Sequence, residues 1–158
     1  AQALNQPVGR VFGHLCDAAL GDARCGLAVT AQAGTVTVAV DARRFAADGL
    51  DGFAAGDFTG GRLVFTSGGN DGCAMEIKAH VRSGGAVQIE LWQAMPEPVR
   101  SGDGFTVTPG CDKQFSTCKA RFGNAVNFRG FPFMPGNDAV IATPGTGQAL
   151  DGGSRYGN

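Results

Sequence analysis

Alternation of apolar and polar residues dominates the middle of this 158-residue chain. It is clearest over 73–82 and 86–93, which a Ser-Gly-Gly turn joins, so these two stretches predict a β-hairpin. The pattern places Cys73 on the apolar face, as a small buried core residue, and His80 on the opposite, solvated face. Trp92 falls on the polar face of the second stretch, where it either packs under a loop or marks an interface.

Four shorter stretches with the same character predict further strands over 27–32, 35–41, 62–66 and 105–108. Gly34 is expected to turn the chain between the first two, with Val36, Val38 and Val40 on one face. Residues 41–61 read as a loop, and its expected anchors are Phe45, Leu50, Phe53 and Phe58. Glycine is abundant, at 26 of 158 residues, which favours tight turns and short strands. The predicted fold is therefore mainly β, an antiparallel β-barrel or sandwich of about six short strands.

One or two short helices, which carry the cysteine pairs, are expected beside these strands. Residues 6–20 carry apolar side chains at helical spacing, although Gly9 and Gly13 weaken the pattern. A second helix is expected over 112–121. In this interpretation residues 1–142 form one domain, and residues 143–158 form an extended or flexible tail with little to bury.

The charge distribution narrows the possible partners. The formal net charge is −1, and no basic run is longer than Arg43-Arg44, so neither direct nucleic-acid recognition nor binding to a membrane surface is expected. No apolar run reaches 18 residues, which predicts no membrane anchor. The first ten residues also lack the charged and apolar regions of a signal peptide.

The five cysteines are the main chemical signal. Cys16 and Cys25 form one pair near the start of the chain, and Cys111 and Cys118 form a second pair far downstream. If Cys111 and Cys118 lay two turns apart on the second helix, about 10 Å would separate them along its axis, beyond the limit of about 7 Å for a disulfide. The cysteine content suits a metal or cluster in a reducing cytoplasm.

Spacing alone does not identify the group that these cysteines hold. Structural zinc sites use more closely spaced cysteines, and ferredoxin spacing is absent as well. A four-thiolate site, two disulfides and unlinked buried cysteines are all open at this point.

A family resemblance adds to this pattern. The run GCDKQFSTCKARFGNAVNFRGFPFMPGND, residues 110–138, resembles the C-terminal signature of tail-hub proteins from siphophage-like particles and gene transfer agents. CDAALGDARCG is similar to that family's first cysteine pair, and GRLVFTSGGNDG to its central strand and turn. The same cysteine spacings occur in minor tail protein L of phage lambda, whose C-terminal domain holds an iron–sulfur cluster. The resemblance covers residues 8–137. It implies a 4Fe-4S cluster bound by Cys16, Cys25, Cys111 and Cys118.

The resemblance also implies a role. It points to a structural component of the tail tip, a hub or baseplate, in a virion or gene-transfer particle and synthesised in the bacterial cytoplasm. The implied assembly is a homotrimer, and the implied partners are a distal tail protein and a receptor-side tail-tip protein. The family's N-terminal half has no counterpart in this chain, so contacts made there lie outside its reach.

No residue pattern predicts catalysis. Nucleophile-elbow, phosphate-loop, dinucleotide and zinc-helix motifs are absent, and Glu76, Glu90 and Glu97 are isolated. Four cysteine ligands would also leave no open iron for a substrate. We therefore expect a non-enzyme, whose cluster joins two distant segments. The alternatives are an iron–sulfur redox or electron-transfer protein and a zinc-stapled interaction module.

Residues around the cysteines carry weaker expectations. His14 either acts as a ligand or donates a hydrogen bond to a sulfur, or it is a partly buried helix residue. Arg121 and Arg129 either donate hydrogen bonds near the cluster or lie on the surface. A dry shell around the cluster is expected from Phe122, Phe128, Phe131 and Phe133.

Overall fold

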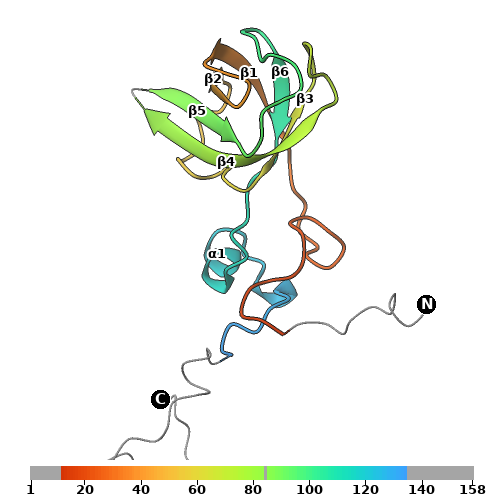
Figure 1. The fold of residues 1–158 in the computed structure, drawn as a ribbon. Helices are drawn as coiled ribbons and strands as arrows, with labels where there is room; N and C mark the ends of the chain where they lie inside the picture. Colours follow the sequence, from red (N-terminus) through yellow and green to blue (C-terminus); the bar gives the residue numbers. More distant parts are fainter. Residues whose placement is uncertain (1–11, 84, 135–158) are drawn as a thin grey trace, which may run out of the picture.

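A closed antiparallel barrel forms the larger part of the protein in the computed structural model, which describes residues 12–83 and 85–134 (Figure 1). Its strands are β1 (Gln32–Ala39), β2 (Arg44–Asp48), β3 (Arg62–Phe65), β4 (Ala74–Ser83), β5 (Ala86–Leu91) and β6 (Gly104–Val107). They follow the order β1-β2-β5-β4-β3-β6, and β6 pairs with β1 to close the barrel. The predicted mainly β fold is confirmed, as a barrel and not a sandwich.

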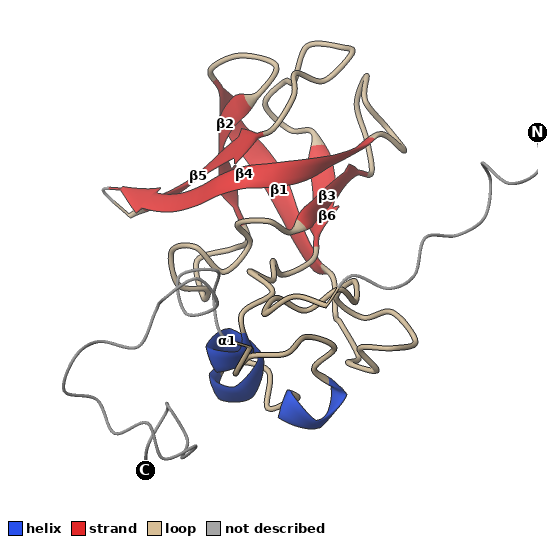
Figure 2. Cartoon of the chain, turned by 60° about the horizontal axis from the view of Figure 1, so that its bottom comes forward, coloured by secondary structure: helices blue, strands red, loops and turns tan. Residues whose placement is uncertain are grey.

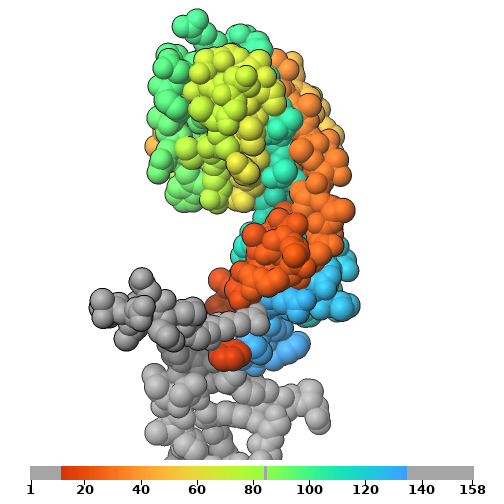
Figure 3. Space-filling view, turned by 90° about the vertical axis from the view of Figure 1, so that its right-hand side faces the viewer, coloured from red at the N-terminus to blue at the C-terminus, as the bar shows by residue number. Residues whose placement is uncertain are grey.

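The pairing of β1 with β6 determines where the rest of the chain lies. Gln32, at the start of β1, is opposite Val107, at the end of β6. The segments outside these two strands therefore leave the same end of the barrel and form a smaller lobe there (Figure 2). This lobe contains α1 (Phe115–Ala120) and the 3-10 turn η2 (Ala125–Asn127). The space-filling view shows the red first segment against the blue last segment (Figure 3).

Aromatic side chains fill the barrel. Phe45, Phe65 and Phe105 are buried, with ring centroids 5.8 to 6.3 Å apart in tilted and edge-on contacts. Burying each such side chain contributes on the order of 2 kcal/mol to folding. Leu50 and Phe58, expected to anchor the loop between the strands, are also fully buried.

The predicted and observed strands agree at β3, β4, β5 and β6, within two residues at each end. The strand predicted over 35–41 corresponds largely to β1, whereas the strand predicted over 27–32 and the turn between them were wrong. Gly34 is not a turn: β1 runs through it, opposite Phe105, and a Cβ there would lie 2.6 Å from the Phe105 ring. Glycine is needed at this position because the aromatic ring covers the strand. The sixth strand is β2, which lies in the predicted loop.

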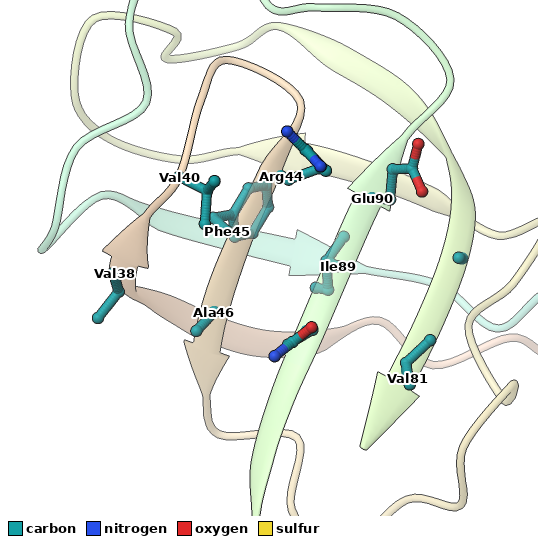
Figure 4. Close-up of a pocket in the computed structure, with 10 residues that line it drawn as sticks. Val38, Val40, Arg44, Phe45, Ala46, Val81, Ile89 and Glu90 are labelled. Carbon is teal, nitrogen blue, oxygen red and sulfur yellow. The ribbon is translucent and has the colours of Figure 1, made fainter. Parts of the chain in front are cut away.

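Two irregularities reverse the direction of side chains within strands. The register shifts between Val36 and Val38 in β1, and again between Ile77 and Ala79 in β4. An extra residue at such a bulge moves every later side chain to the opposite face. Val38, Val40 and Val81 are therefore exposed around a shallow hollow on the outer face of the barrel (Figure 4). The prediction that all three valines of the first strand share one face was wrong.

The bulge in β4 turns the side chain of His80 into the barrel. Its side chain is only 2% exposed and packs edge-on against Phe58, with ring centroids 5.1 Å apart. By hydrogen-bond geometry, neither ring nitrogen is paired with a partner among the described residues. Burial lowers the pKa of His80 and outweighs the opposing effects of Asp57 and the Ala54 backbone, so the site favours the neutral ring. The predicted solvated position was wrong, because strict alternation does not account for a bulge.

The predicted helix over 6–20 is not observed in its described part. Residues 12–20 form loop and turn, and the earlier residues lie outside the described ranges, as does the predicted tail 143–158. Neither described helix is long and apolar enough to cross a membrane.

Candidate cysteine centre

Four cysteines from two distant segments line one cavity in the lobe. Cys16 and Cys25 come from the segment before β1, and Cys111 and Cys118 come from the segment after β6. The cavity is tight: the space in it open to the centre of a water molecule is only about 20 Å³. All four are partly buried free thiols. Cys73 lies elsewhere and packs against the barrel core, in agreement with its predicted structural role.

The first cysteine segment is a loop organised by Asp22. Its carboxylate accepts hydrogen bonds from the backbone N–H groups of Ala19, Arg24 and Cys25, at 3.0, 2.9 and 2.7 Å. The Cys25 N–H contributes most to lowering the pKa of Asp22. Only Ala19 among these donors belongs to the predicted helix, and its N–H takes the Asp22 carboxylate as partner and not the carbonyl four residues earlier, which favours a loop there.

The second segment enters α1 later than predicted. Asp112 accepts hydrogen bonds from the Gln114 N–H at 2.9 Å and from the Thr117 hydroxyl at 2.7 Å. The helix therefore begins at Phe115, so Cys118 is helical and Cys111 is not. The expectation that both lie two turns apart on one helix face was wrong, yet both still face the cavity.

Backbone contacts join the two segments beside the cavity. The Cys16 N–H donates to the Lys113 carbonyl at 3.0 Å, and the Lys113 ammonium donates to the Ala18 carbonyl at 2.6 Å. Lys113 has φ of 63°, the one positive value of a non-glycine residue in the described chain. That conformation costs roughly 1–2 kcal/mol, so the surrounding contacts must hold it in place.

Hydrogen-bonding groups also point at the sulfurs. The Arg129 backbone N–H lies 3.5 Å from Cys16 Sγ, and the Asn124 side-chain amide lies 3.5 Å from Cys25 Sγ. Cys118 Sγ is 3.4 Å from the Asn124 carbonyl, to which the thiol donates. Sequence reasoning missed Asn124, because a single asparagine among turn residues carries no distinctive pattern.

The expected aromatic shell is only half present. Phe122 and Phe128 line the cavity, but Phe131 and Phe133 are 39% and 86% exposed, so the prediction was wrong for those two. They pack instead at the surface of the lobe, Phe131 against Phe12. His14 is exposed and does not line the cavity.

The two arginines act on backbone carbonyls. The Arg129 guanidinium donates to the Arg24 carbonyl at 3.2 Å, which ties the end of the lobe to the first cysteine segment. Arg121 donates to the carbonyls of Gly110 and Asp57, at 3.2 and 2.7 Å, and forms an ion pair with the Asp57 carboxylate. Arg121 therefore connects the lobe to the barrel.

The cysteines are close enough to influence each other electrostatically. Burial raises the pKa of the Cys118 thiol, and the neighbouring sulfurs of Cys16, Cys111 and Cys25 raise it further. Several thiolates at such close range repel each other, so they are stable together only when a cation neutralises them.

A single ion and a cluster make different demands on the positions of the sulfurs. One tetrahedral zinc ion needs every sulfur about 2.3 Å from one point, which places the sulfurs about 3.8 Å from each other. In the part of the chain that the structure describes, no group of three or more His, Cys, Asp or Glu side chains could hold a metal ion. In a cluster each thiolate binds its own iron, so the sulfurs need not converge on one point. Four cysteines around one cavity fit that donor set.

Comparison with known proteins places the chain in a family. The family model described as "Phage conserved hypothetical protein BR0599" matches residues 56–138, more than half of the chain. The chain belongs to this family. The match runs from the loop after β2 through both downstream cysteines of the BR0599-family chain. A second model, "Baseplate hub protein, N-terminal attachment domain", matches residues 1–28, which contain Cys16 and Cys25.

One solved structure resembles the whole domain. It is a chain from "Virion of native gene transfer agent (GTA) particle", 36% identical, with a TM-score of 0.80. The similarity covers 96% of this BR0599-family chain and 54% of the virion chain, so the chain spans about half the length of that neighbour. No curated protein sequence matches.

Proposed function

We propose that this domain is a structural part of the tail tip of a phage or gene-transfer particle, in its hub or baseplate. The observation that carries the proposal is the 36% identity to a chain of a gene-transfer-agent virion over nearly the whole domain. The match of residues 1–28 to an attachment domain of baseplate hub proteins supports the same role. The domain acts by assembly and has no turnover of its own.

The finer features follow from the tail-hub resemblance. A homotrimeric ring is the proposed assembly, and closed symmetry is usual for homo-oligomers. A distal tail protein and a receptor-side tail-tip protein are its proposed neighbours.

We further propose that Cys16, Cys25, Cys111 and Cys118 bind a 4Fe-4S cluster. The supporting observations are the shared cavity, the N–H groups directed at two of the sulfurs, and the resemblance to lambda minor tail protein L. When bound, the cluster supplies a covalent cross-link between two chain segments. The cysteine loops, Lys113 and α1 hold the thiols in place, and Phe122 and Phe128 limit access of water.

Protein purified without oxygen is expected to be brown and to contain iron and inorganic sulfide in near-equal amounts, about four of each per chain. Metal analysis and a sulfide assay on the same sample would measure both. Stoichiometric zinc in protein made with ample iron would favour the zinc-stapled module and count decisively against the cluster. Reversible reduction at an accessible potential, with an assembly role excluded, would favour an electron carrier.

Assembly is tested on particles. Trp92 is 55% exposed on the barrel, a position that suits contact with another subunit. Particles carrying Trp92→Ala are expected to assemble less often, as scored by electron microscopy, while the adjacent exposed Gln93→Ala leaves assembly unchanged. Wild-type yields from Trp92→Ala would remove this residue from the contact surface. Normal particles that lack the whole domain would refute the hub role.

A further inference from the structure

Asn124 touches both halves of the cysteine centre. Its side-chain amide donates to the Cys25 carbonyl at 2.7 Å and approaches Cys25 Sγ at 3.5 Å. Its backbone N–H donates to the Cys118 carbonyl at 3.0 Å, a contact that does not require a proton on the Cys118 sulfur. One partly buried residue thus connects two cysteines that lie 93 positions apart.

The orientation of the Asn124 amide is determined by a neighbour. Asn127, at the end of η2, donates from its side-chain amide to Asn124 Oδ1 at 2.8 Å. Because Oδ1 is occupied as an acceptor, the NH₂ group must face Cys25. The opposite rotamer would place a carbonyl oxygen against the Cys25 carbonyl, where two acceptors repel each other.

We propose that Asn124 is a positioning residue for the cluster: it holds Cys25 beside Cys118 and donates a hydrogen bond to the Cys25 sulfur. This inference rests on the proposed cluster. Groups that orient metal ligands typically change metal affinity by 10–100-fold when they are removed. Hydrogen bonds to the ligand sulfurs also set the reduction potential of a cluster. A donor stabilises the more negative, reduced state, so Asn124 raises the potential.

Two substitutions separate these effects. Asn124→Ala removes both side-chain contacts with Cys25. Asn124→Asp keeps the size and the acceptor for Asn127, but it loses the N–H donor and adds a negative charge near the sulfur. Both variants are expected to lose iron to a chelator at least about tenfold faster than wild type. Both are also expected to have a more negative reduction potential in an anaerobic dithionite titration.

A matched control is available in the barrel. Asn70 is a buried asparagine whose side chain also makes two hydrogen bonds to backbone, both to Glu97, at 2.9 and 3.0 Å. Asn70→Ala is expected to lower the melting temperature and to leave the potential and the iron-release rate at wild-type values. A purely structural role for Asn124 would give the pattern of this control.

The wild-type protein provides a test that does not depend on the variants folding. Reduced protein grown with ¹⁵N-labelled asparagine side chains is expected to show coupling between an asparagine nitrogen and the cluster in pulsed electron paramagnetic resonance. Absence of that coupling, or wild-type potential and iron release in both cluster-loaded Asn124 variants, would overturn the inference. A wild-type protein with no iron and sulfide would instead refute the proposed cluster itself.

Discussion

Cys118→Ser is expected to leave anaerobically prepared protein without a complete cluster and to loosen the lobe, and Cys111→Ser is expected to do the same. Ligand loss removes binding free energy that is coupled to folding, on the order of several kcal/mol. Cys73→Ala serves as the internal control, because it trims one small side chain beside the barrel core at a cost of about 1 kcal/mol.

Iron content and melting temperature would be measured on all three variants. The serine variants should lose iron and melt at a clearly lower temperature, while Cys73→Ala keeps its iron. Equal melting-temperature losses in all three would show that the ligand assignment is wrong.

Gly110→Ala is expected to destabilise the protein by roughly 3–5 kcal/mol or to prevent folding. Gly110 is buried where β6 passes into the lobe, and a Cβ there would overlap the Thr59 carbonyl oxygen and lie 2.9 Å from the Gly61 nitrogen. These neighbours are backbone atoms and cannot rotate away. Moving Gly110 would also disturb its hydrogen bonds with Asp57 and Arg121.

Urea unfolding would measure this loss of stability. Gly52→Ala is the matched control, because a Cβ at Gly52 meets nothing within 4 Å. Its free energy of unfolding should stay within about 0.5 kcal/mol of wild type. A similarly small change for Gly110→Ala would show that the backbone can relieve the overlap with the Thr59 carbonyl at little cost.

The period-two pattern was sufficient to predict the hairpin of β4 and β5, because their polar and apolar residues alternate for most of their length. It failed where an extra residue enters a strand. The bulge in β4 places His80 and Val81 on the faces opposite to those predicted. The prediction failed because the residue types around the bulge carry no signature of it. In β2 the sequence RFAAD buries only Phe45 and Ala47, and such a small apolar set does not stand out from a loop.

The four cysteines were singled out from their spacing and from the family resemblance. That they line one cavity depends on how the barrel brings the two segments together. Cys25 and Cys111 meet because β1 and β6 are neighbours, and sequence alone does not reveal which strands pair. The supporting groups were harder still to predict. Asn124 acts through a side-chain orientation that Asn127 determines, and this relation exists only once both residues are in place.

The pairing of β1 and β6 also governs how the domain bears force. Both chain segments leave the same end of two antiparallel strands, so pulling them apart would open the hydrogen bonds between these strands one after another, like a zipper. The lobe lies between the points of pull and that strand pair, and contacts such as Cys16 N–H to the Lys113 carbonyl cross it. Tension on the two segments therefore reaches the lobe first, and the barrel is loaded only after the lobe yields.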